Sequence, residues 1–292
     1  MNVLVGTAEG LFAGDRSALA GGSVRWLTQR DGDWWAVADR KVVRRDGNDW
    51  REIASAEGVR CVQPVNGVTV AGTAGAHLLR VGEGELETIR SFDTVPGRDE
   101  WHAVGSREPY VRSLTATADG VILANVHVGG IPRSTDGGAT WAPTIDVDAD
   151  VHQVRAHPAR PELVLAAAAV GVCRSDDAGA TWQVRTDGLH ATYCRAVALA
   201  GDLMLVSASS GPFTEQGALF RRALDADGPF ERCTDGLPEW QPDNIDTGCL
   251  DTDGERAAFG GSDGVVYGSE DAGRTWRVLA DGLPPVTAVA IA

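Results

Sequence analysis

Seven polar residues occupy matching positions in seven short β-type segments, and their types are suited to holding an anion. Each follows an apolar residue at the start of its segment. This polar set consists of Arg25, Arg60, Arg112, His152, Arg195, Asp246 and Thr287. Guanidinium groups bind carboxylates, phosphates and sulfates through paired hydrogen bonds. Because alternate strand residues point to opposite faces, we expect the apolar residues to pack between sheets and the polar set to face a channel. The arginines could instead pair with local carboxylates or water.

Histidines and a tyrosine could add proton transfer or metal binding to such a site. His127 ends an apolar segment and is expected to approach Arg112 and His152, while His102 comes from a long insertion. Imidazoles bind zinc, copper or iron, and a single one can act as a base near neutral pH. The candidate catalytic residues are His127, His152 and Tyr193. The candidate metal ligands are His102, His127 and His152, although no HxH or HExxH spacing supports them. No cofactor is predicted, and a divalent metal is left open.

Three long insertions are expected to rise from the face that carries the polar set. They span residues 92–110, 207–217 and 238–244. Long loops on a rigid scaffold often carry binding residues. Trp101 and His102 are therefore predicted to contact a ligand, and the alternative is that Trp101 and Trp240 only anchor their loops.

An internal repeat indicates the scaffold that positions these residues. The pattern S-x-D-x-G-x-T-W occurs at Ser134–Trp141, Ser175–Trp182 and Ser269–Trp276. A second repeat, D-G-L, begins at Asp187, Asp235 and Asp281. The spacing is roughly the length of one four-stranded propeller blade. The Asp is expected to accept backbone N–H bonds, the Gly to adopt positive φ, and the Trp to fill space between sheets.

The S-x-D-x-G-x-T-W pattern resembles the Asp-box (BNR) repeat of sialidases, sortilin-like proteins and a photosystem assembly factor. The resemblance implies a β-propeller in which each box lies on an outer hairpin, away from the ligand face. Asp136, Asp177 and Asp271 are therefore expected to be structural. Such sialidases have six blades and an F/Y-R-I-P motif near the N-terminus. Here Gly130-Ile131-Pro132-Arg133 lies in the middle of the chain, so sialidase activity is not predicted.

The segment pattern predicts one all-β domain over residues 1–292, a seven-bladed propeller closed by the C-terminal strand. Six blades is the alternative, because the first and third blades lack clear boxes. Residues 2–7 match the second strand of other blades, so the last strand is expected to complete the first blade. The predicted innermost strands are Val24–Leu27, Val59–Val62, Val111–Leu114, Val151–Val154, Cys194–Val197, Ile245–Gly248 and Val286–Val289.

Composition and charge limit the classes of partner and the cellular compartment that are expected. The chain has 292 residues, with 26 Lys+Arg against 41 Asp+Glu and a net charge of −15. This charge makes nucleic acids and anionic membranes poor partners. No signal peptide or apolar run of about 18 residues is present, and the five cysteines contain no CxxC. We therefore expect a cytoplasmic protein with buried free thiols.

Three functions follow from these features. The first is a binding propeller for a small anion, a carboxylate, phosphate or sulfate, at an Arg/His-lined pocket. The second is a hydrolase or lyase acting on such a substrate, either glycosidase-like or metal-assisted. The third is an assembly or scaffold protein whose arginine face binds an acidic protein segment. Fold alone does not choose among them, because propellers host unrelated functions.

Overall fold

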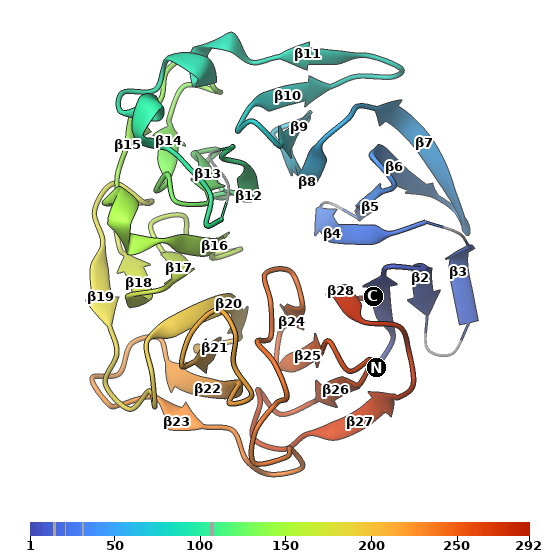
Figure 1. Ribbon diagram of the computed structural model, residues 1–292, viewed down its shortest axis with the longest axis vertical. Helices are drawn as coiled ribbons and strands as arrows, with labels where there is room; N and C mark the ends of the chain where they lie inside the picture. Colours follow the sequence, from blue (N-terminus) through green and yellow to red (C-terminus); the bar gives the residue numbers. More distant parts are fainter. Residues whose placement is uncertain (14–15, 21, 31, 106–107) are drawn as a thin grey trace. The chain divides into compact units, whose positions relative to one another are not determined.

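The fold is a seven-bladed β-propeller. The computed structural model describes residues 1–13, 16–20, 22–30, 32–105 and 108–292. Within these residues the strands form seven antiparallel four-stranded sheets (Figure 1). Seven blades are therefore confirmed and six are excluded. The three short 3-10 helices among the described residues are η1 (Arg90–Thr94), η2 (Arg98–Glu100) and η3 (Val147–Ala149). In the same residues, no helix has the length and apolar character needed to cross a bilayer.

The blades are numbered here in chain order, and their strands have the following bounds. Blade 1 is β28 (Val286–Ile291), β1 (Val3–Thr7), β2 (Gly10–Ala13) and β3 (Arg16–Ala20); blade 2 is β4 (Val24–Arg30), β5 (Asp33–Ala38), β6 (Lys41–Asp46) and β7 (Asp49–Ser55); blade 3 is β8 (Val59–Val65), β9 (Val68–Thr73), β10 (Leu78–Val81) and β11 (Leu86–Thr88). Blade 4 is β12 (Val111–Ala116), β13 (Ile122–Val126), β14 (Pro132–Ser134) and β15 (Ala142–Pro143); blade 5 is β16 (Val151–Ala156), β17 (Val164–Ala168), β18 (Gly171–Ser175) and β19 (Gln183–Arg185). Blade 6 is β20 (Tyr193–Ala200), β21 (Leu203–Ser209), β22 (Ala218–Ala223) and β23 (Glu231–Arg232); blade 7 is β24 (Leu250–Asp253), β25 (Arg256–Gly260), β26 (Val266–Ser269) and β27 (Arg277–Ala280).

Blade 1 is built from both ends of the chain, as the sequence predicts. The C-terminal strand β28 pairs antiparallel with β1, with Val3 opposite Ile291 and Val5 opposite Val289. The Ala292 N–H extends the ladder by donating to the Asn2 carbonyl at 3.0 Å.

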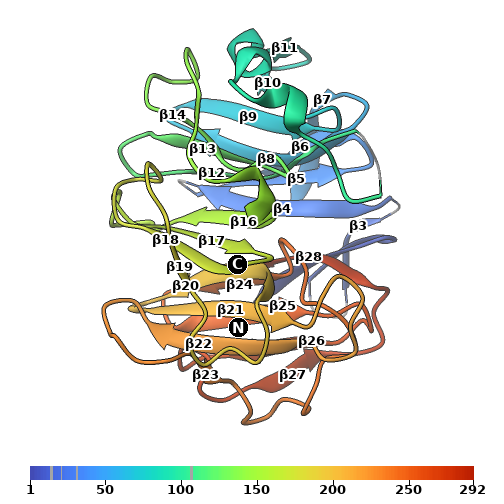
Figure 2. The same cartoon turned by 60° about the vertical axis from the view of Figure 1, so that its left-hand side comes forward.

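The chain divides into two compact units. The first unit comprises Met1–Leu27, Ala169–Val172 and Arg185–Ala292, and the second comprises Thr28–Ala168 and Cys173–Val184. The first unit therefore holds blades 1, 6 and 7, and the strands of blade 6 follow one another in chain order (Figure 2). The second unit holds blades 3 and 4 and most of blades 2 and 5. That residues 1–292 form a single domain stays a prediction.

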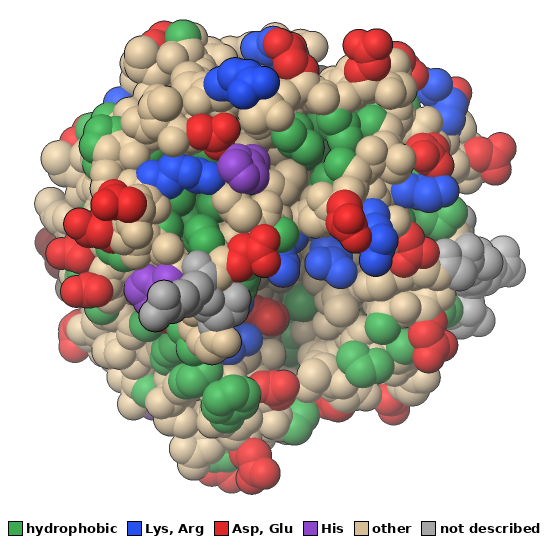
Figure 3. Space-filling view, turned by 45° about the horizontal axis from the view of Figure 1, so that its top comes forward, with side chains coloured by type: hydrophobic (Ala, Val, Ile, Leu, Met, Phe, Trp, Pro, Cys, Tyr) green, Lys and Arg blue, Asp and Glu red, His purple; other side chains and the backbone are tan. Residues whose placement is uncertain are grey.

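Each unit has its own apolar core. In the first unit the Phe259 ring lies 5.0 Å from Tyr267 and 5.2 Å from Trp276, measured between ring centroids. In the second unit the buried residues Leu123 and Val164 pack in a cluster with partly buried Trp182 against it. All five cysteines are buried and unbridged, as expected. On the face that Figure 3 shows, acidic side chains are dispersed among fewer Lys and Arg, in keeping with the net charge of −15.

Two of the apolar residues that precede members of the polar set pack against the neighbouring blade, as expected. Val111 of blade 4 lies so close to Gly72 of blade 3 that a Cβ on this glycine would approach Val111 Cγ1 to 2.5 Å. Val286 of blade 1 approaches Gly260 of blade 7 in the same way, also to 2.5 Å. A glycine in the second strand of one blade thus makes room for the first strand of the next blade.

One predicted strand is wrong. Ile245–Gly248 is not a strand, and the first strand of blade 7 begins only at Leu250. The reason is a turn in which the Cys249 N–H donates to the Asp246 carbonyl at 2.9 Å, while Gly248 adopts φ 79°. Asp246 consequently lies in a turn that leads into the blade.

The three S-x-D-x-G-x-T-W segments form the same turn. In the first, the Asp136 carboxylate accepts hydrogen bonds from the Thr140 N–H at 2.9 Å, the Thr140 hydroxyl at 2.6 Å and the Ser134 hydroxyl at 2.8 Å. Thr140 foremost, with Ser134, lowers the pKa of Asp136 to about 2. For Asp177 and Asp271, slight burial acts to raise the pKa, but the equivalent hydrogen bonds outweigh it and the pKa of each is about 2. These carboxylates have a structural role in their turns.

These turns make a prediction about acid stability. Because the folded-state pKa of Asp177 lies below the unfolded value of about 3.9, its contribution is present above that value and is lost as the pH falls toward 2. The Asp177→Asn protein should therefore melt below the wild type at pH 6, and the gap should narrow between pH 4 and 2. Melting curves across this range test it, and a gap that is independent of pH would contradict it.

Two D-G-L repeats pair through their backbone with an outer hairpin, one with the third box and one with the hairpin of blade 6. The Trp276 N–H donates to the Asp235 carbonyl at 2.9 Å, and the Phe230 N–H donates to the Asp187 carbonyl at 2.8 Å. The glycine of each repeat has positive φ, 87° at Gly188 and 79° at Gly236. At Asp235 and Trp276, the two repeats of the sequence therefore pack directly against each other.

Candidate functional site

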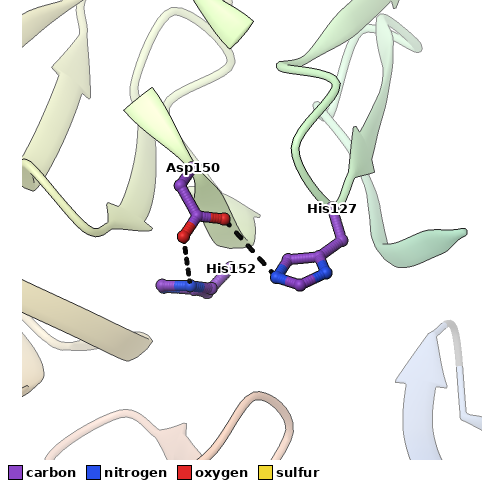
Figure 4. A group of neighbouring side chains, drawn as sticks. All are labelled: His127, Asp150 and His152. Atoms are coloured by element: carbon purple, nitrogen blue, oxygen red, sulfur yellow. Dashed lines mark ion pairs between the residues drawn. The ribbon is translucent and has the colours of Figure 1, made fainter. Parts of the chain in front are cut away.

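Two histidines and an aspartate meet in the second unit (Figure 4). His127 Nε2 lies 3.4 Å from Asp150 Oδ1, and His152 Nε2 lies 3.4 Å from Asp150 Oδ2. The two imidazole centroids are 5.9 Å apart. His127 and His152 are buried, at 6% and 0% exposure, and the Asp150 side chain is 18% exposed. Two buried imidazoles thus share one carboxylate.

Each member is held by a different local structure. His127 directly follows β13, and its N–H donates to the Tyr110 carbonyl at 3.0 Å. Asp150 ends η3 in the left-handed conformation, at φ 47°, which Asp tolerates better than most residues. His152 is the second residue of β16. The cluster is therefore held by the end of β13, the start of β16 and the 3-10 turn η3.

Four members of the polar set lie at β-bulges, which simple strand alternation does not predict. In β8 the pairing register shifts between Val59 and Cys61, so Arg60 is the extra residue. The same shift leaves Arg112 extra in β12 and His152 extra in β16. Thr287 has this position in β28 of the first unit. A bulge bends the strand and re-aims one side chain, so these residues are presented by repeated irregularities in their ladders.

Positive charge surrounds the carboxylate of the cluster. Burial acts to raise the pKa of Asp150, but the contact with His152 and the charges of His152, His127 and Arg112 outweigh it and lower the pKa. Asp150 is therefore ionised at neutral pH and is close enough to Arg112 to feel its charge. Sequence reasoning missed Asp150. The available signal was its place two residues before His152, at the end of the acidic run that includes Asp146 and Asp148.

An arginine and a tyrosine extend the cluster along the second unit. The Arg60 guanidinium lies over the Tyr110 ring, 4.0 Å from its centroid. The Tyr110 ring in turn lies 5.0 Å from the His127 ring. Arg60, Tyr110 and His127 therefore form a series of neighbouring planar groups, with the rings tilted to one another, that ends at His152.

The insertion at 92–110 places Trp101 and His102 in different surroundings. Trp101 is 5% exposed, packs 5.6 Å from Phe92 and has the Arg98 guanidinium 4.9 Å from its ring, so it anchors the loop. His102 is exposed, and its Nδ1 lies 3.2 Å from the Glu100 carbonyl. His102 is not part of the His127–Asp150–His152 cluster. Residues 106–107 of this insertion lie outside the described part of the chain.

The remaining members of the polar set belong to the first unit. Arg195 forms an ion pair with Asp246 at 3.2 Å and donates to the Pro212 carbonyl at 3.2 Å, with its guanidinium 5.4 Å from the Tyr193 ring. The Thr287 hydroxyl donates to the Val24 carbonyl. Arg25 is exposed. Local pairing of Arg195 matches the alternative that the sequence left open. Because the polar set is divided between the units, a channel shared by all seven residues stays a prediction.

The cluster has the chemical groups for three tasks. A carboxylate beside an imidazole orients it for proton transfer. Two imidazoles and a carboxylate are a common ligand set for divalent metals. Arg112 and Arg60 supply the positive charge that an oxyanion requires. The catalytic roles of His127, His152 and Tyr193, and the ligand roles of Trp101 and His102, stay predictions.

No known family model matches the chain. No curated protein matches it either.

Solved structures share its fold at low sequence identity. One is a protein from Lactobacillus plantarum, with a TM-score of 0.66, 14% identity and 99% of each chain covered. Another is an ancestral GH74 enzyme, with a TM-score of 0.66, 15% identity and 95% of this chain covered. The chain spans only 40% of that enzyme's length. A third is virginiamycin B lyase from Staphylococcus aureus, with a TM-score of 0.61, 15% identity, and 88% of this chain and 83% of the lyase covered. At these identities the comparisons show a seven-bladed β-propeller with enzymes among its structural neighbours.

Proposed function

We propose that the protein binds a small oxyanion, a carboxylate, phosphate or sulfate, at the His127–Asp150–His152 cluster. The observation that carries this proposal is the meeting of two buried histidines on a single carboxylate, whose pKa the charge of Arg112 also lowers. The Arg60 guanidinium lies over the ring of Tyr110, which adjoins His127, so a second positive charge lies near the cluster. Positive charge next to buried imidazoles suits an anion that accepts hydrogen bonds.

A thermal-shift panel of carboxylates, phosphates, sulfates and acidic sugars tests this function. A ligand that binds only the folded state adds about 2.7 kcal/mol to its stability at 100 times the dissociation constant. The melting temperature of the wild type should rise with one ligand class, and the rise should disappear in Arg112→Ala. Arg80→Ala is the matched control, because Arg80 is an exposed arginine of the same unit that pairs with Glu87 at 2.9 Å.

Two outcomes would contradict the proposal, and in both of them the two proteins behave alike. An equal response in Arg112→Ala and wild type would place the anion elsewhere. A flat panel in both would remove the small-ligand function and favour a scaffold that binds an acidic protein segment, to be sought by pull-down. Since all five cysteines are buried thiols, we place this function in a reducing compartment such as the cytoplasm.

A hydrolase or lyase is the second candidate, and the paired contacts of Asp150 with two imidazoles favour it. In this function Arg112 holds the anionic group of the substrate while His152 or His127 transfers a proton. Structural neighbours that are named as a GH74 enzyme and a lyase add support. Turnover of the ligand found in the panel, with a pH profile that changes in His152→Gln, would establish it.

A further inference from the structure

We infer that His127, Asp150 and His152 form a binding site for a divalent transition-metal ion, with zinc the preferred ion. The three side chains each offer one ligand atom, and these atoms all lie within 4.8 Å of one another. This inference goes beyond anion binding and uses none of the arginines.

The spacing of the ligand atoms fits a single ion bound by all three side chains. Zinc lies about 2.0–2.2 Å from imidazole nitrogen and carboxylate oxygen, so two tetrahedral ligands are about 3.4 Å apart. Each Nε2 lies 3.4 Å from an Asp150 oxygen. A direct hydrogen bond between a charged imidazole and a carboxylate is shorter, about 2.7–2.9 Å. Each of these two separations, one to Oδ1 and one to Oδ2, therefore matches the distance between neighbouring ligands of a small cation.

The surroundings also suit a metal site in which one coordination position is left open. Both imidazoles are at most 6% exposed, so water competes little with these ligands. The set supplies one negative charge, which leaves a bound divalent ion with a net charge of about +1. Three protein ligands leave the fourth position of tetrahedral zinc open to water or an anion. That open position gives a physical reason for arginine and metal to coexist, because an oxyanion can bind both.

The ligands come from rigid parts of the second unit. His152 lies in β16, His127 follows β13, and Asp150 is held by the η3 turn, whose last N–H donates to the Val147 carbonyl at 3.2 Å. A site made from the ends of two strands and a hydrogen-bonded turn is largely formed before the ion binds.

Metal titration of the full-length protein tests the inference. Tag-free protein is stripped with a chelator and titrated with Co²⁺, followed by visible absorption, and then with Zn²⁺ in competition. The buffer contains no phosphate, sulfate or carboxylate. We expect one equivalent of metal per chain and the absorption of a tetrahedral Co²⁺ site. His127→Gln and His152→Gln should each weaken binding by at least about 100-fold, and Asp150→Asn by at least about 10-fold.

The control is His102→Gln, which removes an exposed histidine of the same unit and should leave the affinity unchanged. Melting curves establish that each variant is folded, and the near-isosteric Asp150→Asn keeps the test decisive if His152→Gln unfolds. Failure of the wild type to bind one equivalent would overturn the inference. Undiminished binding in Asp150→Asn, or an equal loss in His102→Gln, would overturn it as well.

The oxyanion function is judged by a separate result. Metal binding that survives in Arg112→Ala, together with a flat anion panel, would retain the metal site and remove the oxyanion function. An anion response without metal binding would do the reverse.

Discussion

The Gly236→Ala protein is expected to lose more than about 4 kcal/mol of unfolding free energy, the range reached only by severe single changes. Gly236 has φ 79°, where a side chain costs about 1–2 kcal/mol by itself. A Cβ there would also lie 1.8 Å from the Trp276 carbonyl oxygen. Relief requires movement of backbone that is hydrogen bonded, because the Trp276 N–H donates to the Asp235 carbonyl. Urea unfolding measures the loss.

Gly282→Ala is the matched control for this substitution. Gly282 has the same place in the D-G-L repeat and a similar φ of 73°, but a Cβ there has no atom within 4 Å. It should therefore cost only the backbone term, about 1–2 kcal/mol. Equal losses in the two variants would mean that backbone strain alone, and not the approach to Trp276, makes this glycine necessary.

Trp141→Ala is expected to cost about 3–5 kcal/mol, the range for removing a large buried aromatic side chain. Trp141 is 8% exposed and meets the Phe92 ring edge-on, with 5.0 Å between centroids. Its indole N–H also donates to the Gly138 carbonyl at 3.2 Å. The substitution opens a cavity under the 92–110 insertion and should leave the chemistry of the His127–Asp150–His152 cluster in place. Denaturant unfolding and Co²⁺ titration of the same variant check both statements.

Trp182→Ala provides the comparison at the same position of the next box. Trp182 is only partly buried, and its indole N–H donates to the Thr144 hydroxyl at 3.1 Å. A smaller loss than in Trp141→Ala is expected because less apolar surface is exposed. If both variants lose the same stability, the box tryptophan acts through its turn and not through the contact with Phe92.

The blades could be predicted from sequence because their signals are local. The box turn uses partners at most four residues apart, as in Asp136 and Thr140. Strand alternation also depends on near neighbours, and the expected packing of Val111 between blades is present. The last strand could be assigned to blade 1 because residues 2–7 lacked a first strand of their own.

The details of the site depend on contacts that sequence patterns do not record. The bulge at Arg60 is visible only when β8 is paired with β9. A turn at Gly248 stands where a strand was predicted. The sequence could not indicate this turn, because glycine permits a left-handed conformation without imposing it. Asp150 joined the two histidines through the fold of η3, whereas His102 had the right chemistry and lay outside the cluster. Side-chain type identified the candidates, and backbone irregularities selected among them.

Blade 1 combines strands that are far apart in the sequence, and this affects folding during synthesis. Strand β1 leaves the ribosome long before its partner β28, because most of the propeller lies between Thr7 and Val286 in the chain. At about 5–20 residues per second, one edge of β1 waits on the order of tens of seconds for its partner. During that interval the edge is able to pair with another chain. We therefore expect the yield of folded protein to depend on translation speed and on chaperones that shield β1, even where the finished protein is stable.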